Sequence, residues 1–514
     1  KAVDMFRAIG DGRIKAVWIM ATNPAVSLPD ANAVRAALGK CDFVAVSDCV
    51  RGTDTSRYAD VLLPAAGWGE KDGTVTNSER RISRQRGFMP LPGEAKPDWW
   101  IITEVAQRMG YGKAFEYSKP ADIFREHALL SGFENTGARL FDISALAALD
   151  DAGFDAMSPV QWPVTAAHPE GLERLLGDGK FPTPDGRGQF VATPPGIPAF
   201  WPVSDYPMVL NTGRTRDQWH TMTRTGCVAK LGRHSPEPYV EIGASDAARY
   251  GVTEGGLARV QTGLGKTVLR VRISDDQRPG MMFAPIHWND QFASQAVVGK
   301  LIAPATDPVS GQPEFKCTPA SIEAADFRWS GLLLSRRQLT LAGIGYWNRR
   351  AGDGCHIYRL AGDDDPALAG QWVRKYFGSV LAEGNVEYQD RGRGMYRAAH
   401  VGAAGIDACL FIGPGDGLPD SDWLESLFSE TRLAHEVRAA ILHGRPAGRI
   451  CDSGPMVCAC YNVGQKTIIN AILEEGLESV TEIGAAVQAG TNCGSCRPEI
   501  QALLNSVAAH QDAA

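Results

Sequence analysis

The sequence predicts a multidomain α/β protein, with a parallel α/β region first, a β-barrel in the middle and a small helical module at the C-terminus. Three observations predict this fold class. Short apolar runs alternate with helix signals near the N-terminus, as in parallel sheets. Strand-like runs separated by glycine-containing turns occupy the central third. The last sixty residues combine helical periodicity with the cysteine motifs CAC and CGSC.

Composition narrows the function classes. The 514 residues are 44% apolar and 22% charged, which is ordinary for globular proteins with sizeable cores. No apolar run reaches the length of a membrane span, so we expect no membrane partner. A net charge of −7 gives no support to nucleic-acid binding. The chain starts at Lys1, inside a helix-like stretch without a targeting segment, so we expect the C-terminal part of a longer protein.

Cysteine usage predicts a reducing compartment, the cytoplasm. Seven of the eleven cysteines are scattered, unlike the dense disulfide framework of a small secreted domain. These seven are Cys41, Cys49, Cys227, Cys317, Cys355, Cys409 and Cys451. We interpret Cys41 and Cys49 as ordinary buried cysteines and Cys451 as a free thiol.

The N-terminal pattern consists of three apolar runs, at 16–20, 42–46 and 60–63. Residues 29–38 form a helix in the prediction, starting near a proline and ending at Gly39. The resulting β-α-β-α-β order predicts a parallel sheet. Ligands of such sheets bind beyond the carboxyl ends of the strands.

Polar residues stand at these strand ends, Asn23 after the first run and Ser47 and Asp48 after the second. The Gly-x-Gly-x-x-Gly fingerprint is absent after the first strand, so a nucleotide bound here would be held differently. A carboxylate there can accept hydrogen bonds from a ribose or a guanine edge. Turn formation explains Asn23 and Asp48 equally well.

A basic segment follows at 68–87, WGEKDGTVTNSERRISRQRG. Its cations are Lys71, Arg80, Arg81, Arg84 and Arg86. Arginine forks suit phosphates, and charge-assisted hydrogen bonds contribute about 1.5–3 kcal/mol each. A solvated basic face is the commoner origin of such a run.

The central third contains strand-like runs at 208–211, 258–262 and 268–273, as in a barrel without exposed edges. The loop TGRTRDQWHT at 212–221 directly follows the first of them. Its arginines and hydroxyls suit an anionic ligand. His220 alone is more often structural, because no metal-ligand partner lies three or four residues away. We do not assign it as a catalytic base.

Residues 329–450 predict a small α+β segment, with a helix at 420–443 and a linker after it. No chemistry is assigned to them.

Four cysteines near the C-terminus can hold one metal centre, and they are Cys458, Cys460, Cys493 and Cys496. Helices are predicted at 465–474, 479–488 and from 496 onward, with Ser479 and Glu482 forming a capping box. Helix N-termini favour thiolate-bound clusters. Zinc is the alternative, but structural zinc sites usually have Cys-x-x-Cys at both ends, whereas one end here is Cys-x-Cys. The spacing therefore favours iron–sulfur over zinc.

Longer segments resemble a known family. WIMATNPAVSLPDA, SDCVRGTDTSRYADVLLPAAGWGEKDGTVTNSERR and LNTGRTRDQWHTMTRTG resemble molybdopterin oxidoreductases, and within them the large (catalytic) subunit of bacterial assimilatory nitrate reductases. The resemblance covers residues 1 to about 325 and about 450 to 505. The cysteine segment is similar to the [2Fe-2S] domain of bacterioferritin-associated ferredoxin.

The resemblance implies five regions. They are an α/β molybdopterin-guanine-dinucleotide-binding region at 1–150, a connecting segment at 151–205, a β-barrel molybdopterin dinucleotide-binding domain at 206–328, the poorly matched segment and linker at 329–450, and a helical [2Fe-2S] domain at 451–508.

It also implies cofactor contacts. The implied residues are Asn23, Ser47, Asp48, Lys71, Asp98, Thr212, Gly213, Arg214, Arg216, Trp219, His220, Thr221, Asn289 and Lys316. Without the resemblance, Asp98 reads as a helix N-cap and Lys316 as a surface lysine.

The implied function is molybdenum-dependent reduction of nitrate to nitrite in nitrogen assimilation. The implied cofactors are molybdenum bis-molybdopterin guanine dinucleotide, a [2Fe-2S] cluster bound by the four cysteines, and a [4Fe-4S] cluster in a part preceding Lys1. The molybdenum ligand is expected there too, so this chain alone should not reduce nitrate. The electron donor is expected to be a ferredoxin, a flavodoxin or an NADH-dependent subunit.

Two other functions stay open at this point. One is a formate dehydrogenase-like molybdenum oxidoreductase, which shares much of the dinucleotide-binding scaffold. The other is a non-catalytic iron–sulfur electron-transfer subunit.

Overall fold

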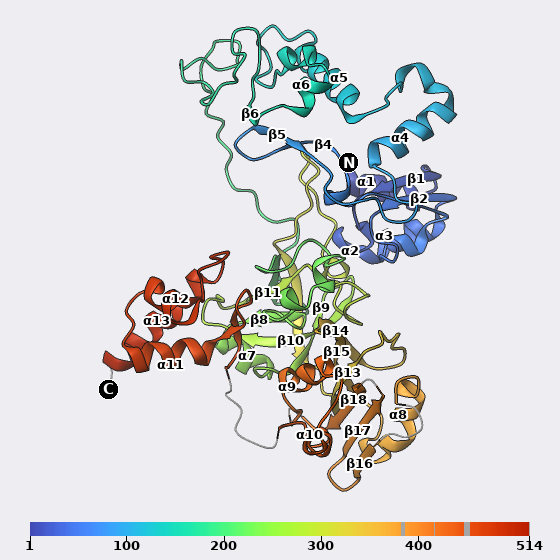
Figure 1. Ribbon diagram of the computed structural model, residues 1–514, viewed down its shortest axis with the longest axis vertical. Helices are drawn as coiled ribbons and strands as arrows, with labels where there is room; N and C mark the ends of the chain where they lie inside the picture. The colour runs from blue at the N-terminus through green and yellow to red at the C-terminus, as the bar shows by residue number, and fades with distance from the viewer. Residues whose placement is uncertain (382–385, 404, 416, 447–452, 513–514) are drawn as a thin grey trace.

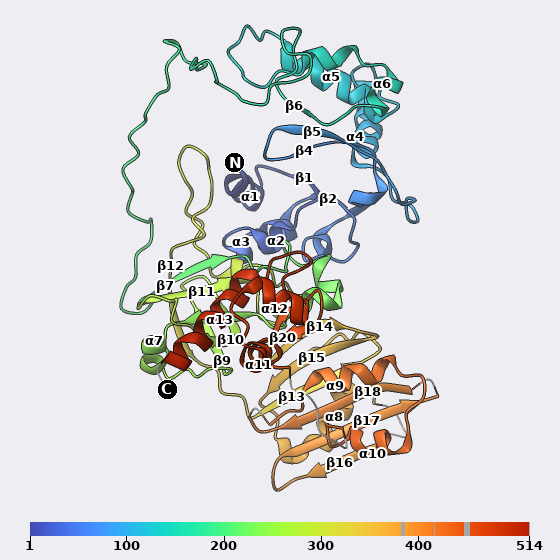
Figure 2. The same ribbon diagram turned by 60° about the vertical axis from the view of Figure 1, so that its left-hand side comes forward.

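The predicted fold class is confirmed by a computed structural model that describes residues 1–381, 386–403, 405–415, 417–446 and 453–512. A closed β-barrel lies at the centre, as Figure 1 shows. The N-terminal α/β region lies on one side of it, a six-stranded sheet on the other, and the C-terminal helices pack beside it. Figure 2 shows the same order from a second direction.

The N-terminal sheet has the predicted parallel order β1-β2-β3. Its elements are α1 (Ala2–Gly10), β1 (Ala16–Met20), α2 (Pro24–Ser27), α3 (Ala31–Lys40), β2 (Phe43–Asp48) and β3 (Val61–Pro64). The predicted α-helix between the last two strands is wrong, since that connection holds only the 3₁₀ turn Ser56–Tyr58. Twelve residues separate these strands. Among them, Thr55 is hydrogen-bonded to Asn23 within the same region, and Asp54 accepts from the Asp290 amide of the barrel region.

A cluster of apolar side chains lies within residues 73–165 and is separate from the cluster around the N-terminal sheet. This part of the chain contains β4 (Gly73–Thr76), β5 (Arg81–Gln85), α4 (Asp98–Ala106), α5 (Pro120–Gly132), α6 (Asp151–Asp155) and β6 (Val160–Gln161). Of these, β5, α5, α6 and β6 contribute side chains to the cluster. An extended chain then runs along the molecule to the barrel (Figure 2).

The barrel closes in the order β10-β8-β11-β7-β12-β9. Its elements are β7 (Met208–Gly213), β8 (Tyr239–Ile242), α7 (Ala244–Tyr250), β9 (Leu257–Gln261), β10 (Lys266–Ile273), β11 (Met281–Pro285) and β12 (Thr318–Ala324). Alternate side chains of these strands fill the interior with aliphatic residues, which is how a small barrel forms its core.

The segment after the barrel forms an antiparallel sheet in the order β14-β15-β13-β18-β17-β16. Its elements are β13 (Trp329–Ser335), β14 (Tyr346–Gly352), β15 (Cys355–Gly362), α8 (Ala369–Phe377), β16 (Val386–Asp390), β17 (Met395–Gly402), β18 (Gly405–Gly413), α9 (Ser421–Ser426) and α10 (His435–Ile441). The single helix predicted at 420–443 is wrong. It divides into α9, a 3₁₀ turn and α10, which lets Leu424, Phe428 and Ile441 all reach one apolar cluster.

The C-terminal module contains β19 (Met456–Cys458), β20 (Val463–Gly464), α11 (Gln465–Glu475), α12 (Val480–Val487) and α13 (Arg497–Asp512). The predicted capping box is confirmed, because the Ser479 hydroxyl accepts from the Glu482 amide and the Glu482 carboxylate accepts from the Ser479 amide. The apolar core of the module includes Cys458 and Cys496.

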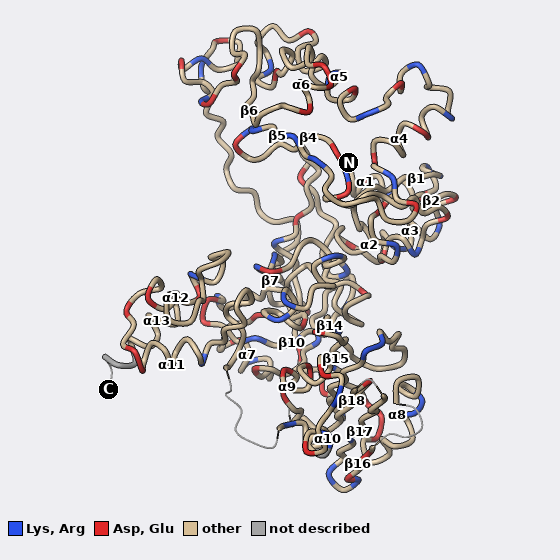
Figure 3. The backbone as a smooth tube through the Cα atoms, in the orientation of Figure 1, with Lys and Arg blue, Asp and Glu red and all other residues tan. Residues whose placement is uncertain are grey.

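Charges of both signs are spread over all regions of the chain (Figure 3). Among the described residues, no helix has both the length and the apolar character needed to cross a bilayer.

Candidate functional site

A cavity of about 360 Å³ lies where the carboxyl edge of the N-terminal sheet faces the loop after β7. This volume falls within the range of small-molecule sites, about 300–1,000 Å³. Eight of the implied cofactor residues line it: Asn23, Ser47, Asp48, Lys71, Asp98, Trp219, His220 and Thr221. The structure therefore brings together residues that are almost 200 positions apart in the sequence.

The strand-end residues are positioned by the sheet and its neighbours. Ser47 is fully buried, and its hydroxyl accepts a hydrogen bond from the Trp18 indole at 2.8 Å. The Asp48 carboxylate accepts from the Val50 amide at 3.0 Å and so forms a turn, while the residue also lines the cavity. Asp48 therefore forms a turn and also lies where a ligand of the sheet would bind, so its placement agrees with both interpretations.

Lys71 and Asp98 form an ion pair on the cavity wall, with 2.6 Å between Nζ and Oδ2. Both side chains are about one-third exposed. The cap of α4 is Pro97 rather than Asp98, which is the first helical residue. The pair therefore presents one positive and one negative group to a ligand in the cavity.

The loop 212–221 divides into two parts. Its second half, Trp219 to Thr221, faces the cavity, and His220 adopts a positive φ of 44°. Such strained backbone is often found at ligand sites. Burial, with the positive charges of Arg214 and Arg224, lowers the pKa of His220. The imidazole is therefore neutral at neutral pH and supplies no fixed charge.

The first half of the loop does not line the cavity. The Thr212 hydroxyl donates to the Phe315 carbonyl at 2.7 Å. A Cβ on Gly213 would come within 2.7 Å of the Phe283 ring, so this glycine permits close packing beside the aromatic ring. Arg214 is exposed. Arg216 points to the C-terminal module, as described below.

Three residues from the connection between β11 and β12 hold the loop. His287 is fully buried; its Nε2 accepts from the Thr215 amide at 2.8 Å, so its Nδ1 donates to the His220 carbonyl at 2.6 Å. The Asn289 amide donates to the Thr221 carbonyl at 2.5 Å, and Lys316 donates to the Thr212 carbonyl. Asn289 and Lys316 thus stand behind the loop and outside the cavity lining.

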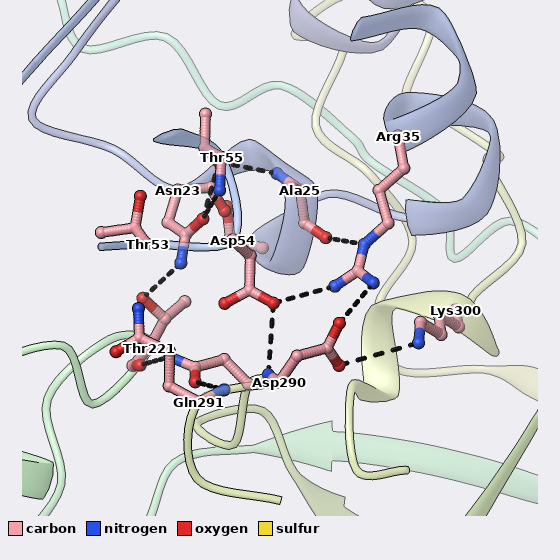
Figure 4. Close-up of polar contacts among 12 residues, drawn as sticks. Asn23, Ala25, Arg35, Thr53, Asp54, Thr55, Thr221, Asp290, Gln291 and Lys300 are labelled. Carbon is pink, nitrogen blue, oxygen red and sulfur yellow. Dashed lines mark hydrogen bonds and ion pairs between the residues drawn. The ribbon is translucent and has the colours of Figure 1, made fainter. Parts of the chain in front are cut away.

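The cavity lies at an interdomain junction built around Asn23 and Arg35 (Figure 4). The Asn23 amide donates to the Thr221 hydroxyl at 3.1 Å and its oxygen accepts from the Thr55 hydroxyl at 2.6 Å. Arg35 lies between Asp54 at 3.1 Å and Asp290 at 2.7 Å. The junction fixes the sheet edge against the barrel loop.

Asp54 should make stability depend on pH. Burial, with the negative charge of Asp290, raises the pKa of Asp54 to about 6 despite Arg35. The folded state then holds a proton that the unfolded state has lost, so stability rises as pH falls through this range and levels off below about pH 4. We expect the wild type to gain about 1 kcal/mol relative to Asp54→Asn between pH 7 and pH 5, measured by urea unfolding. If the free energy of unfolding changed equally with pH in both proteins, the prediction would be contradicted.

The arginines of the basic segment have structural partners. Arg84 is 4% exposed and makes a bidentate pair with Asp72 as well as a contact with Asp155 at 2.8 Å. Arg80 donates to the Leu172 and Glu173 carbonyls. Arg80 and Arg84 therefore belong neither to a phosphate-binding site nor to a solvated basic face. Lys71 is the cation of the segment that lines the cavity.

Several residues of the cavity lining were not predicted from the sequence, among them Thr22, Cys49, Trp68 and Arg224. Thr22 follows the first strand directly, as Asn23 does, and Arg224 belongs to the segment LNTGRTRDQWHTMTRTG that resembles the family. The interpretation of Cys49 as a buried cysteine is wrong, since its side chain is exposed next to the cavity. It follows β2 directly and therefore shares the open carboxyl edge with Asp48.

A second cavity of about 380 Å³ borders all four C-terminal cysteines. Cys460 Sγ lies 3.5 Å from Cys493 Sγ, and Cys458 is hydrogen-bonded to Cys496. Among the described residues, no three ligand-type side chains converge as a single metal ion would require. Two pairs of thiolates fit a two-iron cluster, in which each iron takes two protein ligands, better than one zinc ion.

The surroundings of two cysteines favour thiolates. Burial raises the pKa of Cys458, but hydrogen bonds from the Gly490, Tyr461 and Cys460 amides and from the Cys496 side chain together hold the pKa below its usual value. The Ser495 hydroxyl and amide lower the pKa of Cys493. These donors would stabilise the negative charge of a bound cluster. Cys451 lies outside the described residues.

Family comparisons match these regions. Residues 1–108 match the model described as "Molybdopterin oxidoreductase", residues 208–319 "Molydopterin dinucleotide binding domain", and residues 456–506 "BFD-like [2Fe-2S] binding domain".

Individual relatives agree with the family models. A nitrate reductase of Klebsiella oxytoca is 44% identical over 98% of this chain and 57% of its own length. The assimilatory nitrate reductase catalytic subunit of Bacillus subtilis is 34% identical over 61% of this chain and 43% of its own. An F420-dependent formate dehydrogenase subunit alpha of Methanocaldococcus jannaschii is 35% identical over 60% and 43%. The chain thus spans about half the length of these relatives. Residues 1–108 thus form a molybdopterin oxidoreductase region, residues 208–319 a molybdopterin dinucleotide binding domain, and the C-terminal module a BFD-like [2Fe-2S] binding domain.

Proposed function

We propose that the protein containing this chain reduces nitrate to nitrite for nitrogen assimilation, with electrons entering through the C-terminal [2Fe-2S] domain. One observation carries the proposal: the cavity lined by eight implied cofactor residues and the four-cysteine cavity border the same loop, and both include Trp219. In this proposal the two neighbouring cavities are the sites of the molybdopterin dinucleotide and of the iron–sulfur cluster.

The cavity residues suit one end of a guanine dinucleotide. Lys71 and Arg224 supply positive charge for a pyrophosphate. The Asp48 carboxylate can accept hydrogen bonds from a guanine edge or a ribose. Asn23 and Thr221 keep the two walls together through their hydrogen bond. His287, Asn289 and Lys316 keep the loop in place from behind.

When bound, the molybdenum cofactor supplies the oxygen-atom transfer, in which nitrate, two electrons and two protons give nitrite and water. This chain binds and orients the cofactor and receives the electrons. We propose that the molybdenum ligand and a [4Fe-4S] cluster belong to another part of the protein. A cytoplasmic ferredoxin, flavodoxin or NADH-dependent subunit is the proposed donor.

Formate oxidation is the second candidate. The dinucleotide scaffold does not discriminate, because the Bacillus nitrate reductase and the formate dehydrogenase are 34% and 35% identical over nearly the same share of the chain. Nitrate is favoured by the Klebsiella nitrate reductase, whose similarity extends over 98% of the chain and so includes the cysteine module.

The test uses the full-length protein, purified with its metals. We expect molybdenum and iron on metal analysis, nitrite formation from nitrate with reduced methyl viologen, and two electrons consumed per nitrite. Formate with oxidised dye serves as the control substrate and should give no turnover. Dye reduction by formate without nitrite formation would overturn the proposal in favour of a formate dehydrogenase. Absence of molybdenum would favour the electron-transfer subunit.

A further inference from the structure

The C-terminal module is seated on the barrel segment 216–234, which continues the loop of the candidate dinucleotide site. Arg216 lies 3.0 Å from the Glu499 carboxylate and donates to the Val457 carbonyl at 3.1 Å. His234 approaches the same carboxylate at 3.5 Å. Arg216 was implied as a cofactor contact, but in the structure its guanidinium spans Asp217 and the module.

Two more cations of the segment extend the contact. Lys230 donates to the Cys460 carbonyl at 2.9 Å, and Arg233 donates to the Asn462 side chain at 2.8 Å. In each of these contacts the barrel provides the donor and the module provides the acceptor, which is the complementarity that fixes the register of an interface. The acceptors belong to, or lie close to, the cysteine loops, so this contact fixes the position of the cluster site itself.

Trp219 occupies the boundary between the two cavities. It lines the dinucleotide cavity and also the cavity of the four cysteines. Its ring stacks edge-on against His220 with 4.6 Å between ring centroids. His220 is in turn held through its carbonyl by His287. The indole is therefore part of the wall that both sites share.

We propose that Arg216, Lys230, Arg233 and Glu499 form an internal docking contact that holds the [2Fe-2S] module against the dinucleotide loop, with Trp219 as the positioning residue between the two sites. The role of this contact in electron transfer rests on the proposed function. The docking itself is inferred from the observed contacts alone. The electrons come one at a time from an external one-electron donor protein, and two are needed for each nitrate.

The test changes Glu499, which lies outside both cavity linings, to lysine in the full-length protein. The substitution breaks the ion pair with Arg216 and the contact with His234, and it places a cation opposite Arg216. We expect faster hydrogen exchange in segments 216–234 and 456–462, and a loss of about tenfold in nitrate reduction driven by a reduced ferredoxin-type donor. Turnover driven by methyl viologen, which can reach buried sites without the module, should stay unchanged. Lys230→Glu is the second variant, acting from the barrel side.

Glu475→Lys is the matched control, because it makes the same charge change at the exposed end of α11, for which the described part of the chain shows no ion pair. If both docking variants show the same hydrogen-exchange rates as the wild type, the docking contact is refuted. Faster exchange with an unchanged donor-driven rate would overturn its role in electron entry. A wild-type protein that forms no nitrite with methyl viologen would overturn the proposed function instead, while the exchange data would still decide the docking.

Discussion

Changing Cys460 to serine is expected to remove the [2Fe-2S] cluster. Its sulfur lies 3.5 Å from that of Cys493 at the exposed side of the cysteine cavity, so the change leaves one proposed iron with an incomplete set of thiolates. Metal binding is coupled to the order of small metal-binding modules. We therefore expect loss of the visible absorbance and the electron paramagnetic resonance signal of the reduced cluster, a fall of about two iron atoms per chain, and faster hydrogen exchange in α11 to α13.

Cys227→Ser is the control for this variant, because Cys227 is also exposed but belongs to the barrel and lies outside the cysteine cavity. It should retain full iron content. A wild-type module that contains one zinc ion and no iron would contradict the cluster assignment and favour the zinc alternative. Full iron retention in Cys460→Ser would show that this cysteine is not a ligand.

Changing Arg35 to methionine is expected to weaken the junction between the N-terminal sheet and the barrel. The side chain of Arg35 is 16% exposed, and its three donor nitrogens contact the Ala25 carbonyl, Asp54 and Asp290. Removal leaves the buried Asp54 carboxylate and the partly buried Asp290 carboxylate without their main counter-charge, since Lys300 is 3.8 Å from Asp290. Breaking a buried ion pair in this way costs about 3–5 kcal/mol. A urea midpoint shift and faster exchange in α3 measure the effect.

The matched control is Arg13→Met, which removes an exposed pair with Asp11 at 3.0 Å. Exposed pairs contribute about 0–1 kcal/mol, so this variant should unfold nearly like the wild type. If the two variants shift the midpoint equally, the junction does not stabilise the protein through Arg35. Because Asn23 and Thr221 share this junction, loss of Arg35 should also loosen the cavity.

Local patterns predicted the elements whose signals are short-range. The parallel order of β1 to β3, the barrel and the Ser479 capping box are all present. Strand-end reasoning reached Asn23, Ser47 and Asp48 without any family knowledge, because parallel strands share one carboxyl edge. The resemblance added Lys71 and Asp98, which lie on the same cavity wall.

Contacts between residues far apart in the sequence could not be predicted from local patterns. The charge run at 68–87 gave no sign that Arg84 would be buried against Asp155, some seventy positions away. The apparent helix at 420–443 has the right periodicity, but burying both halves against one sheet requires a break. Arg216 stands in a predicted anion loop, yet its partner Glu499 comes from the end of the chain.

The sequence by itself determined the fold class, the polar strand ends and the four-cysteine module, because these depend on periodicity, capping and local spacing. The family was indicated by the resemblance of longer segments. The tertiary structure decided which residues meet. It placed Asn23 against Thr221, Asp54 against Asp290, and the cysteine module against the dinucleotide loop. Such contacts join residues up to 283 positions apart, and they are set by the packing of whole domains, for which a linear sequence pattern carries no local signal.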